Sequence, residues 1–215
     1  RDQPRSRGLG DVYKRQGLTC VVTADSVEEL PGIADIAHFY GNVRQVGFDI
    51  LREQGRGTAM QAPTAEAMTQ ALEKTYARMK DLEKLTGRKI HFTQENRVHR
   101  LAQTGQYDFP QCYAMRGEAA FVDVRGDIYA CSSLVGWPQY RLGNVRTGRD
   151  PEKVRTVGQQ IRDAMEPCRR CSYFSLCGGG CFSRWLRKDR VVRQSAAECA
   201  LKQFFIRKYK ENHPR

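Results

Sequence analysis

The residues best suited to chemistry in this sequence are its cysteines. Seven of the eight lie between positions 112 and 199, four of them in the compact run Cys168-x2-Cys171-x5-Cys177-x3-Cys181; the others are Cys112, Cys131 and Cys199. Thiolates are ligands for zinc and for iron–sulfur clusters. Closely spaced cysteines in a chain without a secretion signal indicate a bound metal, and seven cysteines would leave one unpaired in any disulfide framework.

Two kinds of metal site fit these thiolates. A single tetrahedral zinc would use the pairs Cys168/Cys171 and Cys177/Cys181. That interpretation leaves the other three cysteines without a role, and the five-residue separation between the pairs is tight for a zinc ribbon. An iron–sulfur cluster is larger and takes its ligands from more distant parts of the backbone. Seven thiolates fit two clusters, one with four ligands and one with three, and the zinc ribbon is the alternative.

The glycines at positions 178–180, between Cys177 and Cys181, favour the cluster. Glycine adopts positive φ readily and lets the backbone approach a ligand closely. Backbone amides near the sulfides of a cluster would donate hydrogen bonds and tune its potential.

The complete pattern resembles the SPASM domain of radical S-adenosylmethionine (SAM) enzymes. It consists of Cys112-x13-Gly126-x4-Cys131, the run from Cys168 to Cys181, and then Cys199. The segments DIYACSSLVG (127–136), LGNV (142–145) and CGGGC (177–181) resemble the usual surroundings of that motif. The resemblance covers about residues 105–205.

The resemblance implies an interleaved set of ligands for two auxiliary [4Fe–4S] clusters. Auxiliary cluster I would be held by Cys112, Cys131 and Cys181, and auxiliary cluster II by Cys168, Cys171, Cys177 and Cys199. It also implies that the intact parent enzyme binds a third [4Fe–4S] cluster and SAM.

One departure from the sulfatase-maturing members concerns the ligands of cluster I. Those members carry a further cysteine shortly after the first, whereas residues 113–117 here contain none, and Ser132 stands where they have an acidic residue. Cluster I would then keep an open iron, with Glu118 as a minor candidate for its fourth ligand. Both differences favour the peptide-modifying members, which bind a substrate thiolate at such an iron.

The elements before the cysteines alternate between strand and helix patterns. We expect a buried strand at 18–23, a helix opened by a capping box at Ser26 or delayed by Pro31, and a second strand at 43–51. A long helix follows from its cap Thr64 to a stop at Gly87, and then a short strand at 90–92. This order predicts an α/β fold with parallel strands, which the resemblance makes the C-terminal part of a partial (β/α) TIM-like barrel.

The cysteine-rich part predicts a different architecture. A hairpin is expected over 119–131 with its turn at Arg125-Gly126, followed by a short strand at 142–145 and a helix at 152–165. A closing helix over 195–209 would bury Leu201, Phe204 and Phe205. We therefore expect three parts: a non-native tail at 1–16, the end of a radical SAM barrel at 17–104, and the SPASM domain at 105–215.

Other candidate residues receive no role in catalysis. The radical-generating motif Cys-x3-Cys-x2-Cys is absent and Cys20 is expected to be a small buried hydrophobe, so this chain alone is predicted to be inactive toward SAM. Ile50 and Leu51 are candidates for SAM contacts by position only, and are expected to be core. Trp137 and Trp185 are expected to pack the small domain. The histidines show no ligand spacing; they are His38, His91, His99 and His213.

The charge distribution and the hydropathy of the sequence restrict the classes of partner that we expect for this chain. The net charge of +12 comes from basic residues spread along the chain, with no stripe typical of nucleic-acid binding. The basic residues of the closing helix are expected to face solvent; they are Lys202, Arg207, Lys208 and Lys210. No apolar run approaches the roughly 18 residues of a transmembrane helix. The first residues are polar and basic and no apolar region follows them, so we expect no signal peptide. We expect a cytoplasmic protein without membrane or nucleic-acid partners.

The resulting hypothesis is a radical SAM/SPASM enzyme, an oxidoreductase-type peptide maturase, that modifies a peptide or protein, for example by thioether cross-link formation. Its partners would be that substrate and a reducing electron donor such as flavodoxin or ferredoxin. The alternatives are formylglycine formation in sulfatases, a zinc-ribbon binding module without enzyme activity, and an electron-transfer protein.

Overall fold

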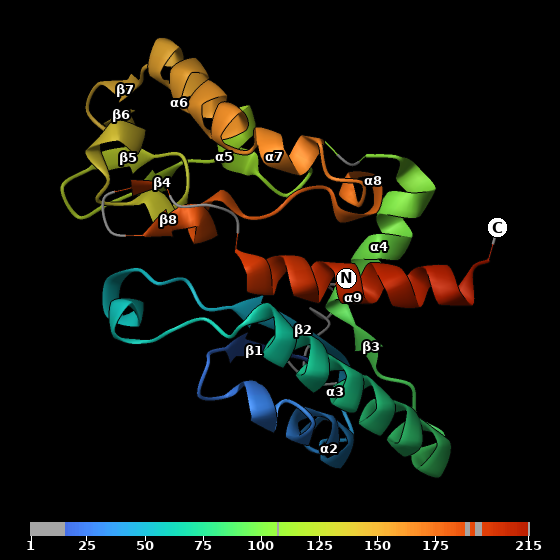
Figure 1. Ribbon diagram of the computed structural model, residues 1–215. Helices are drawn as coiled ribbons and strands as arrows, with labels where there is room; N and C mark the ends of the chain where they lie inside the picture. The colour runs from blue at the N-terminus through green and yellow to red at the C-terminus, as the bar shows by residue number, and fades with distance from the viewer. Residues whose placement is uncertain (1–15, 107, 188–189, 192–194, 215) are drawn as a thin grey trace, which may run out of the picture. The chain divides into compact units, whose positions relative to one another are not determined.

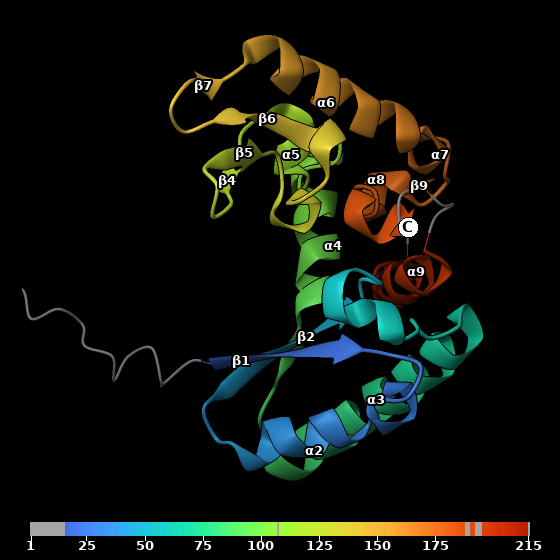
Figure 2. The same ribbon diagram turned by 90° about the vertical axis from the view of Figure 1, so that its left-hand side faces the viewer.

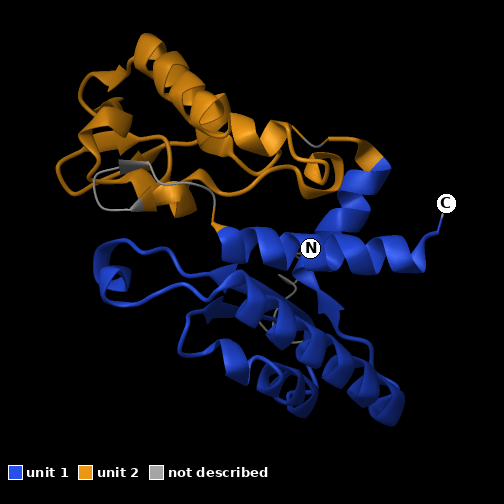
Figure 3. Ribbon diagram, in the orientation of Figure 1, with its two compact units in different colours: residues 1–103, 196–215 blue, residues 104–195 orange. Residues whose placement is uncertain are grey.

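The structure, a computed structural model, describes residues 16–106, 108–187, 190–191 and 195–214. These residues form two compact units (Figure 3). The α/β unit takes its described residues from 1–103 and 196–215, and the cysteine-rich unit from 104–195. The first boundary lies close to the predicted one. The closing helix differs from the prediction, because its packing places it in the α/β unit instead of with the cysteines.

The α/β unit is built on a three-stranded parallel sheet (Figure 1). The strands are β1 (Gln16–Val22), β2 (Val43–Ile50) and β3 (His91–Phe92), in the order β1-β2-β3. Both pairings are parallel, with Cys20 opposite Phe48 and Val46 opposite Phe92. The predicted parallel α/β arrangement is confirmed.

Strand β1 is less buried than the sequence predicts. Only Val22 is fully buried, and Val21 is half exposed. Among the described residues β1 pairs on one side alone, with β2, and its residues alternate between exposed and partly buried positions up to Val22.

Helices cover this sheet on both faces. They are α2 (Gly32–Phe39), α3 (Ala65–Thr86), α4 (Thr93–Thr104) and α9 (Ala196–Asn212), with 3-10 turns η1 (Val27–Glu29) and η2 (Gly55–Ala59). Figure 2 shows α2 on one side of the sheet and α9 on the other. The rings of Tyr76 (α3), Phe92 (β3) and Phe205 (α9) lie in contact and join these elements.

Capping residues explain where two of these helices start and end. The Thr64 hydroxyl accepts a hydrogen bond from the Ala67 amide (3.1 Å), and Gly87 ends α3 in the left-handed conformation with φ 68°, as predicted. Ser26 does not form the expected capping box. Its hydroxyl instead accepts from the Thr23 amide (3.0 Å), and the α-helix begins only after Pro31.

The cysteine-rich unit combines a small antiparallel sheet with short helices. The sheet contains β4 (Phe121–Val122), β5 (Asp127–Tyr129), β6 (Arg141–Asn144) and β7 (Gly148–Arg149) in sequential order. The predicted hairpin and third strand are confirmed, with Gly126 in the turn at φ 83°. A separate hairpin pairs β8 (Leu186–Arg187) with β9 (Arg190–Val191).

The helices of this unit are α5 (Tyr113–Arg116), α6 (Pro151–Ala164), α7 (Glu166–Arg169) and α8 (Phe174–Cys177), with 3-10 turns η3 (Ser132–Leu134), η4 (Pro138–Tyr140) and η5 (Phe182–Trp185). The Asp150 carboxylate caps α6 by accepting from the amides of Glu152 and Lys153. Helix α6 buries Val157 and Ile161 in a core that also holds Trp185, and Trp137 packs against that core. The predicted packing role of both tryptophans is confirmed.

Among the helices that the structure describes, none has the length and apolar character needed to cross a bilayer.

Candidate metal centre

Three of the predicted ligands come together in the cysteine-rich unit although they are far apart in the sequence. Cys112 precedes α5, Cys131 follows β5, and Cys181 follows the glycine loop. All three are partly buried, and the charges of Cys131 and Cys181 act on the Cys112 thiol. This is the interleaved set that the resemblance implies for cluster I.

The Cys112 thiol is held in a largely desolvated environment. Burial raises its pKa, the Met115 amide opposes this by donating a hydrogen bond to the sulfur, and nearby Cys181 and Cys131 raise the pKa further. Thiols gathered in a desolvated place would need a cation to hold them as thiolates.

The second predicted set begins in consecutive tight turns. Cys168 is buried on α7, Cys171 follows it with an amide donating to the Cys168 carbonyl (3.1 Å), and Cys177 ends α8 with an amide donating to the Tyr173 carbonyl (2.8 Å). These three lie in the cysteine-rich unit. Cys199, the fourth residue predicted for this set, lies on α9 and belongs to the α/β unit.

The glycine loop has the conformation that the sequence predicts. Gly178 and Gly179 have φ of 67° and 85°. A Cβ atom at Gly179 would lie 2.4 Å from the ring of Phe109, so the space beside this glycine is filled by an aromatic side chain. The close approach that requires a glycine here is made by Phe109.

The donor set fits a cluster in two respects. All eight cysteines lie in the described part of the chain and none forms a disulfide. The indole N–H of Trp185, four residues after Cys181, is buried without a hydrogen-bond partner among the described residues. A buried donor of this kind suits an acceptor that the polypeptide does not supply, and the sulfides of a cluster are such acceptors.

No group of three or more histidine, cysteine or acidic side chains within the described residues is spaced to hold a single metal ion. The ligands of a cube of four irons are farther apart than those of one ion, because each thiolate binds a different iron.

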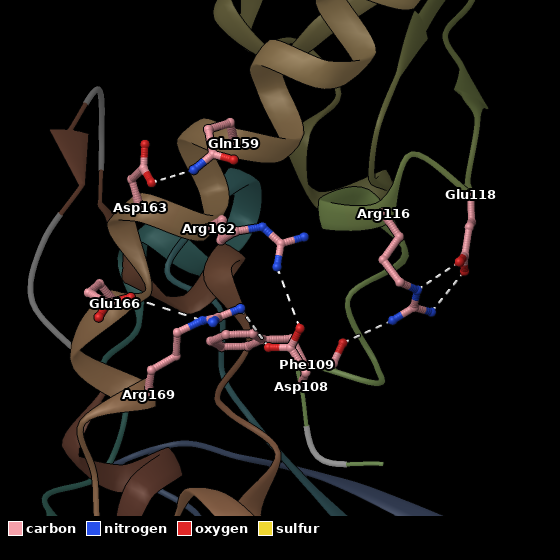
Figure 4. A network of polar contacts seen from close by, with 9 residues as sticks. All are labelled: Asp108, Phe109, Arg116, Glu118, Gln159, Arg162, Asp163, Glu166 and Arg169. Carbon is pink, nitrogen blue, oxygen red and sulfur yellow. Dashed lines mark hydrogen bonds and ion pairs between the residues drawn. The ribbon is translucent and has the colours of Figure 1, made fainter.

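Glu118, the minor candidate for a fourth ligand, is engaged elsewhere. Both of its carboxylate oxygens accept hydrogen bonds from the guanidinium of Arg116 at 2.8 Å (Figure 4). This bidentate contact lowers the pKa of Glu118, and the carboxylate is turned toward the arginine.

The remaining candidates take ordinary structural places. Cys20 is half-buried in β1, where burial raises its pKa. Ile50 is buried and Leu51 partly so. His38 lies 3.2 Å from the Thr86 hydroxyl, and His99 and His213 pack on the ring of Tyr209. None of these belongs to a cluster of ligands within the described residues.

A network of charged residues beside the cysteines was not predicted. Asp108 accepts from Arg169 (2.7 Å) and pairs with Arg162 (3.5 Å), while Arg116 donates to the carbonyl of Phe109 (3.0 Å; Figure 4). The only sequence signal was the position of Arg169 directly after Cys168.

Comparison with known proteins finds likeness at the level of structure. No protein-family model matches the chain, and no curated protein matches it. Solved structures do match, structures of a radical SAM enzyme among them, and the α/β fold with its parallel sheet is similar to theirs.

The particular structures are those of the anaerobic sulfatase-maturing enzyme anSMEcpe, a radical SAM/SPASM enzyme. "Native anSMEcpe with bound AdoMet" is 17% identical with a TM-score of 0.63, over 91% of this chain and 55% of that chain. "Native anSMEcpe with bound AdoMet and Kp18Cys peptide" is 17% identical with a TM-score of 0.61, over 91% and 56%. The chain thus spans about half the length of the structures it matches.

Proposed function

We propose that this chain is the C-terminal part of a radical SAM/SPASM enzyme that modifies a peptide or protein, and that it binds two [4Fe–4S] clusters. The observation that carries the proposal is the convergence of Cys112, Cys131 and Cys181, which follows the interleaved order of the SPASM motif. The fold shared with a radical SAM enzyme supports the same conclusion independently of the cysteines.

The residues of this chain would act mainly as a scaffold. Cys112, Cys131 and Cys181 would hold cluster I, and Cys168, Cys171, Cys177 and Cys199 cluster II. When bound, such clusters supply a site that accepts an electron or binds a substrate thiolate. SAM and the third cluster would bind in the parent enzyme, since the chain contains no Cys-x3-Cys-x2-Cys.

A peptide substrate is supported by the anSMEcpe structures, two of which contain a bound peptide. Thioether cross-link formation is our first choice of reaction, because three cysteines converge at cluster I and residues 113–117 contain no further thiol. Formylglycine formation in a sulfatase is the second candidate, and the structural likeness to anSMEcpe favours it. A flavodoxin or ferredoxin would supply the electron in either case.

A cytoplasmic location belongs to the same proposal. Eight cysteines without a disulfide among them suit a reducing compartment.

Iron and sulfide content after anaerobic purification and reconstitution tests the proposal. The chain is expected to bind about eight irons and about eight sulfides, as two four-iron clusters require. About one zinc and no sulfide would instead establish the zinc ribbon and contradict the proposal.

Paired substitutions then test the assignment of ligands. Cys112→Ser and Cys181→Ser should each remove about half of the iron, and the double variant should lose no more, because both residues serve one cluster. Cys177→Ser combined with Cys181→Ser should lose nearly all of it. Cys20→Ser is the matched control and should keep full iron content. Additive losses in the first double variant would contradict the interleaved assignment.

A further inference from the structure

Phe109 has an unusual backbone conformation three residues before Cys112, the first predicted ligand. It is the one non-glycine residue with positive φ in the described part of the chain, at φ 47°, although its side chain is bulky and 1% exposed. Bulky residues avoid this conformation, so the surroundings of Phe109 must hold it there.

The backbone of Phe109 is tied to Cys112. Its carbonyl oxygen accepts one hydrogen bond from the Cys112 amide (3.0 Å) and a second from Arg116 (3.0 Å). The position of the Cys112 backbone therefore depends on the direction in which this carbonyl points, and the backbone dihedral angles of Phe109, with their unusual φ, set that direction together.

The ring of Phe109 contacts the segment that carries the other cysteines. It packs edge-to-face on Phe174, with centroids 5.1 Å apart, and it fills the space beside Gly179. The guanidinium of Arg169, the residue after Cys168, lies over the ring at 5.6 Å. One side chain thus touches three parts of the segment from Cys168 to Cys181.

Asp108 contacts the same segment through ion pairs at an exposed site. Its carboxylate pairs with Arg162 on α6 and Arg169 on α7, and Glu166 lies 4.0 Å from Arg169 (Figure 4). Asp108 is exposed, so these pairs orient the chain more than they stabilise it.

We propose that Asp108 and Phe109 form a clamp that positions Cys112 against the Cys168–Cys181 segment and thereby sets how firmly cluster I is retained. Phe109 is a positioning residue, because it acts through the Cys112 backbone and the glycine loop. The retention part of this proposal rests on the proposed function, while the positioning of Cys112 can be measured without iron.

Phe109→Leu is the main variant, because leucine keeps most of the apolar volume but cannot make the ring contacts. With a ferrous chelator under anaerobic conditions, we expect iron of cluster I to be lost roughly 10- to 100-fold faster than in the wild type, as for other residues that orient ligands. Loss from cluster II, followed in Cys112→Ser and in Phe109→Leu combined with Cys112→Ser, should rise by much less, because the Phe109 carbonyl is hydrogen-bonded to the Cys112 backbone whereas Phe109 touches the Cys168–Cys181 segment through ring contacts. Phe121→Leu is the matched control, since Phe121 lies in the same unit with its ring partly exposed.

Alkylation of Cys112 in the iron-free chain gives the second readout. Phe109→Leu should raise the rate of maleimide labelling at Cys112, measured by peptide mass spectrometry, without raising it at Cys20. If the wild type binds no iron but this rate still rises, the positioning is confirmed and both the retention and the proposed function are overturned. Unchanged labelling would overturn the clamp itself.

Asp108→Asn is a second variant that tests the clamp if Phe109→Leu fails to fold. It removes the carboxylate charge that pairs with Arg162 and Arg169, at an exposed site. Faster loss of cluster I iron is expected. Asp163→Asn on α6 should match the wild type, because the Asp163 carboxylate accepts only from Gln159 among the contacts drawn in Figure 4. Equal rates in the two variants would overturn the role of Asp108.

Discussion

At the scale of single residues, the cysteine-rich unit depends on positions where the backbone and the available space are restricted together. Phe109 is held at φ 47°, a conformation that costs of the order of 1–3 kcal/mol for such a residue. Gly179 provides the space for its ring. The residue at position 109 therefore restricts which residue types fit at position 179, and the reverse also holds.

We expect Gly179→Ala to destabilise the cysteine-rich unit by roughly 1–3 kcal/mol through overpacking, in addition to the strain of alanine at positive φ. The added methyl group would lie 2.4 Å from the Phe109 ring, which is itself buried and cannot move away easily. Urea unfolding followed by tryptophan fluorescence measures this, because both tryptophans, Trp137 and Trp185, belong to this unit.

Gly136→Ala separates the cost of backbone strain at positive φ from the cost of a steric clash. Gly136 has φ 86°, close to that of Gly179, but a Cβ atom added there would have no described atom within 4 Å beyond its chain neighbours. The variant should lose only about 1 kcal/mol, the cost of the backbone conformation. Equal losses in the two variants would mean that the Phe109 ring does not limit position 179.

At the scale of elements, an ion pair joins two helices of the α/β unit. Arg78 on α3 donates from two nitrogens to the Asp35 carboxylate on α2. The hydrogen bonds from Arg78 lower the pKa of Asp35, so the folded state binds this proton less readily than the unfolded chain.

Asp35→Asn is therefore expected to lower stability slightly at neutral pH, because the pair is exposed. The contribution of a carboxyl group with a lowered pKa is present above its unfolded pKa of about 3.9 and is lost as pH falls through the lower folded value. The difference in unfolding free energy between the wild type and Asp35→Asn should therefore shrink as the pH is lowered into the acid range. Urea midpoints by circular dichroism at several pH values measure it.

Asp81→Asn is the control for this pair. Asp81 contacts only Lys84 among the described ion pairs, at 3.8 Å, and both side chains are more exposed. Its effect should be smaller than that of Asp35→Asn at neutral pH. A difference for Asp35→Asn that persists or grows in acid would contradict the assigned role of the ion pair.

Most elements could be predicted because their signals are local. Thr64 and Gly87 bound α3, and the turn at Gly126 fixes the hairpin, from short-range patterns alone. Helix α4 was missed because it follows β3 without a loop and buries only Val98 and Leu101.

The candidate site was predictable only in part, because some of its contacts join residues that are distant in sequence. The spacing of the cysteines indicates a metal, and the family resemblance supplies their interleaved order. The Asp108–Phe109 clamp depends on contacts with α6, α7 and the glycine loop, which are distant in sequence. No local pattern signals a buried phenylalanine at positive φ.

At the scale of the whole molecule, the two units differ in what holds them together. The α/β unit has the long helices α3 and α9, whose aromatic side chains pack around the parallel sheet. In the cysteine-rich unit the described strands are two to four residues long. Of its six cysteines, Cys168 lies in the core and Cys112 and Cys131 pack against it. If the proposed clusters are bound, their binding free energy would contribute to the folding free energy of this unit.

Removal of iron should therefore affect the two units unequally. If the proposed clusters are bound, anaerobic chelation is expected to lower the protection of backbone amides from hydrogen exchange over 108–187, together with a change in tryptophan fluorescence. Amides of β2 and α3 should keep their protection, because their core of Tyr76, Phe92 and Phe205 contains no metal ligand. Equal loss of protection in both units would mean that they unfold together, and unchanged protection in both would mean that cluster binding contributes little to the stability of the cysteine-rich unit.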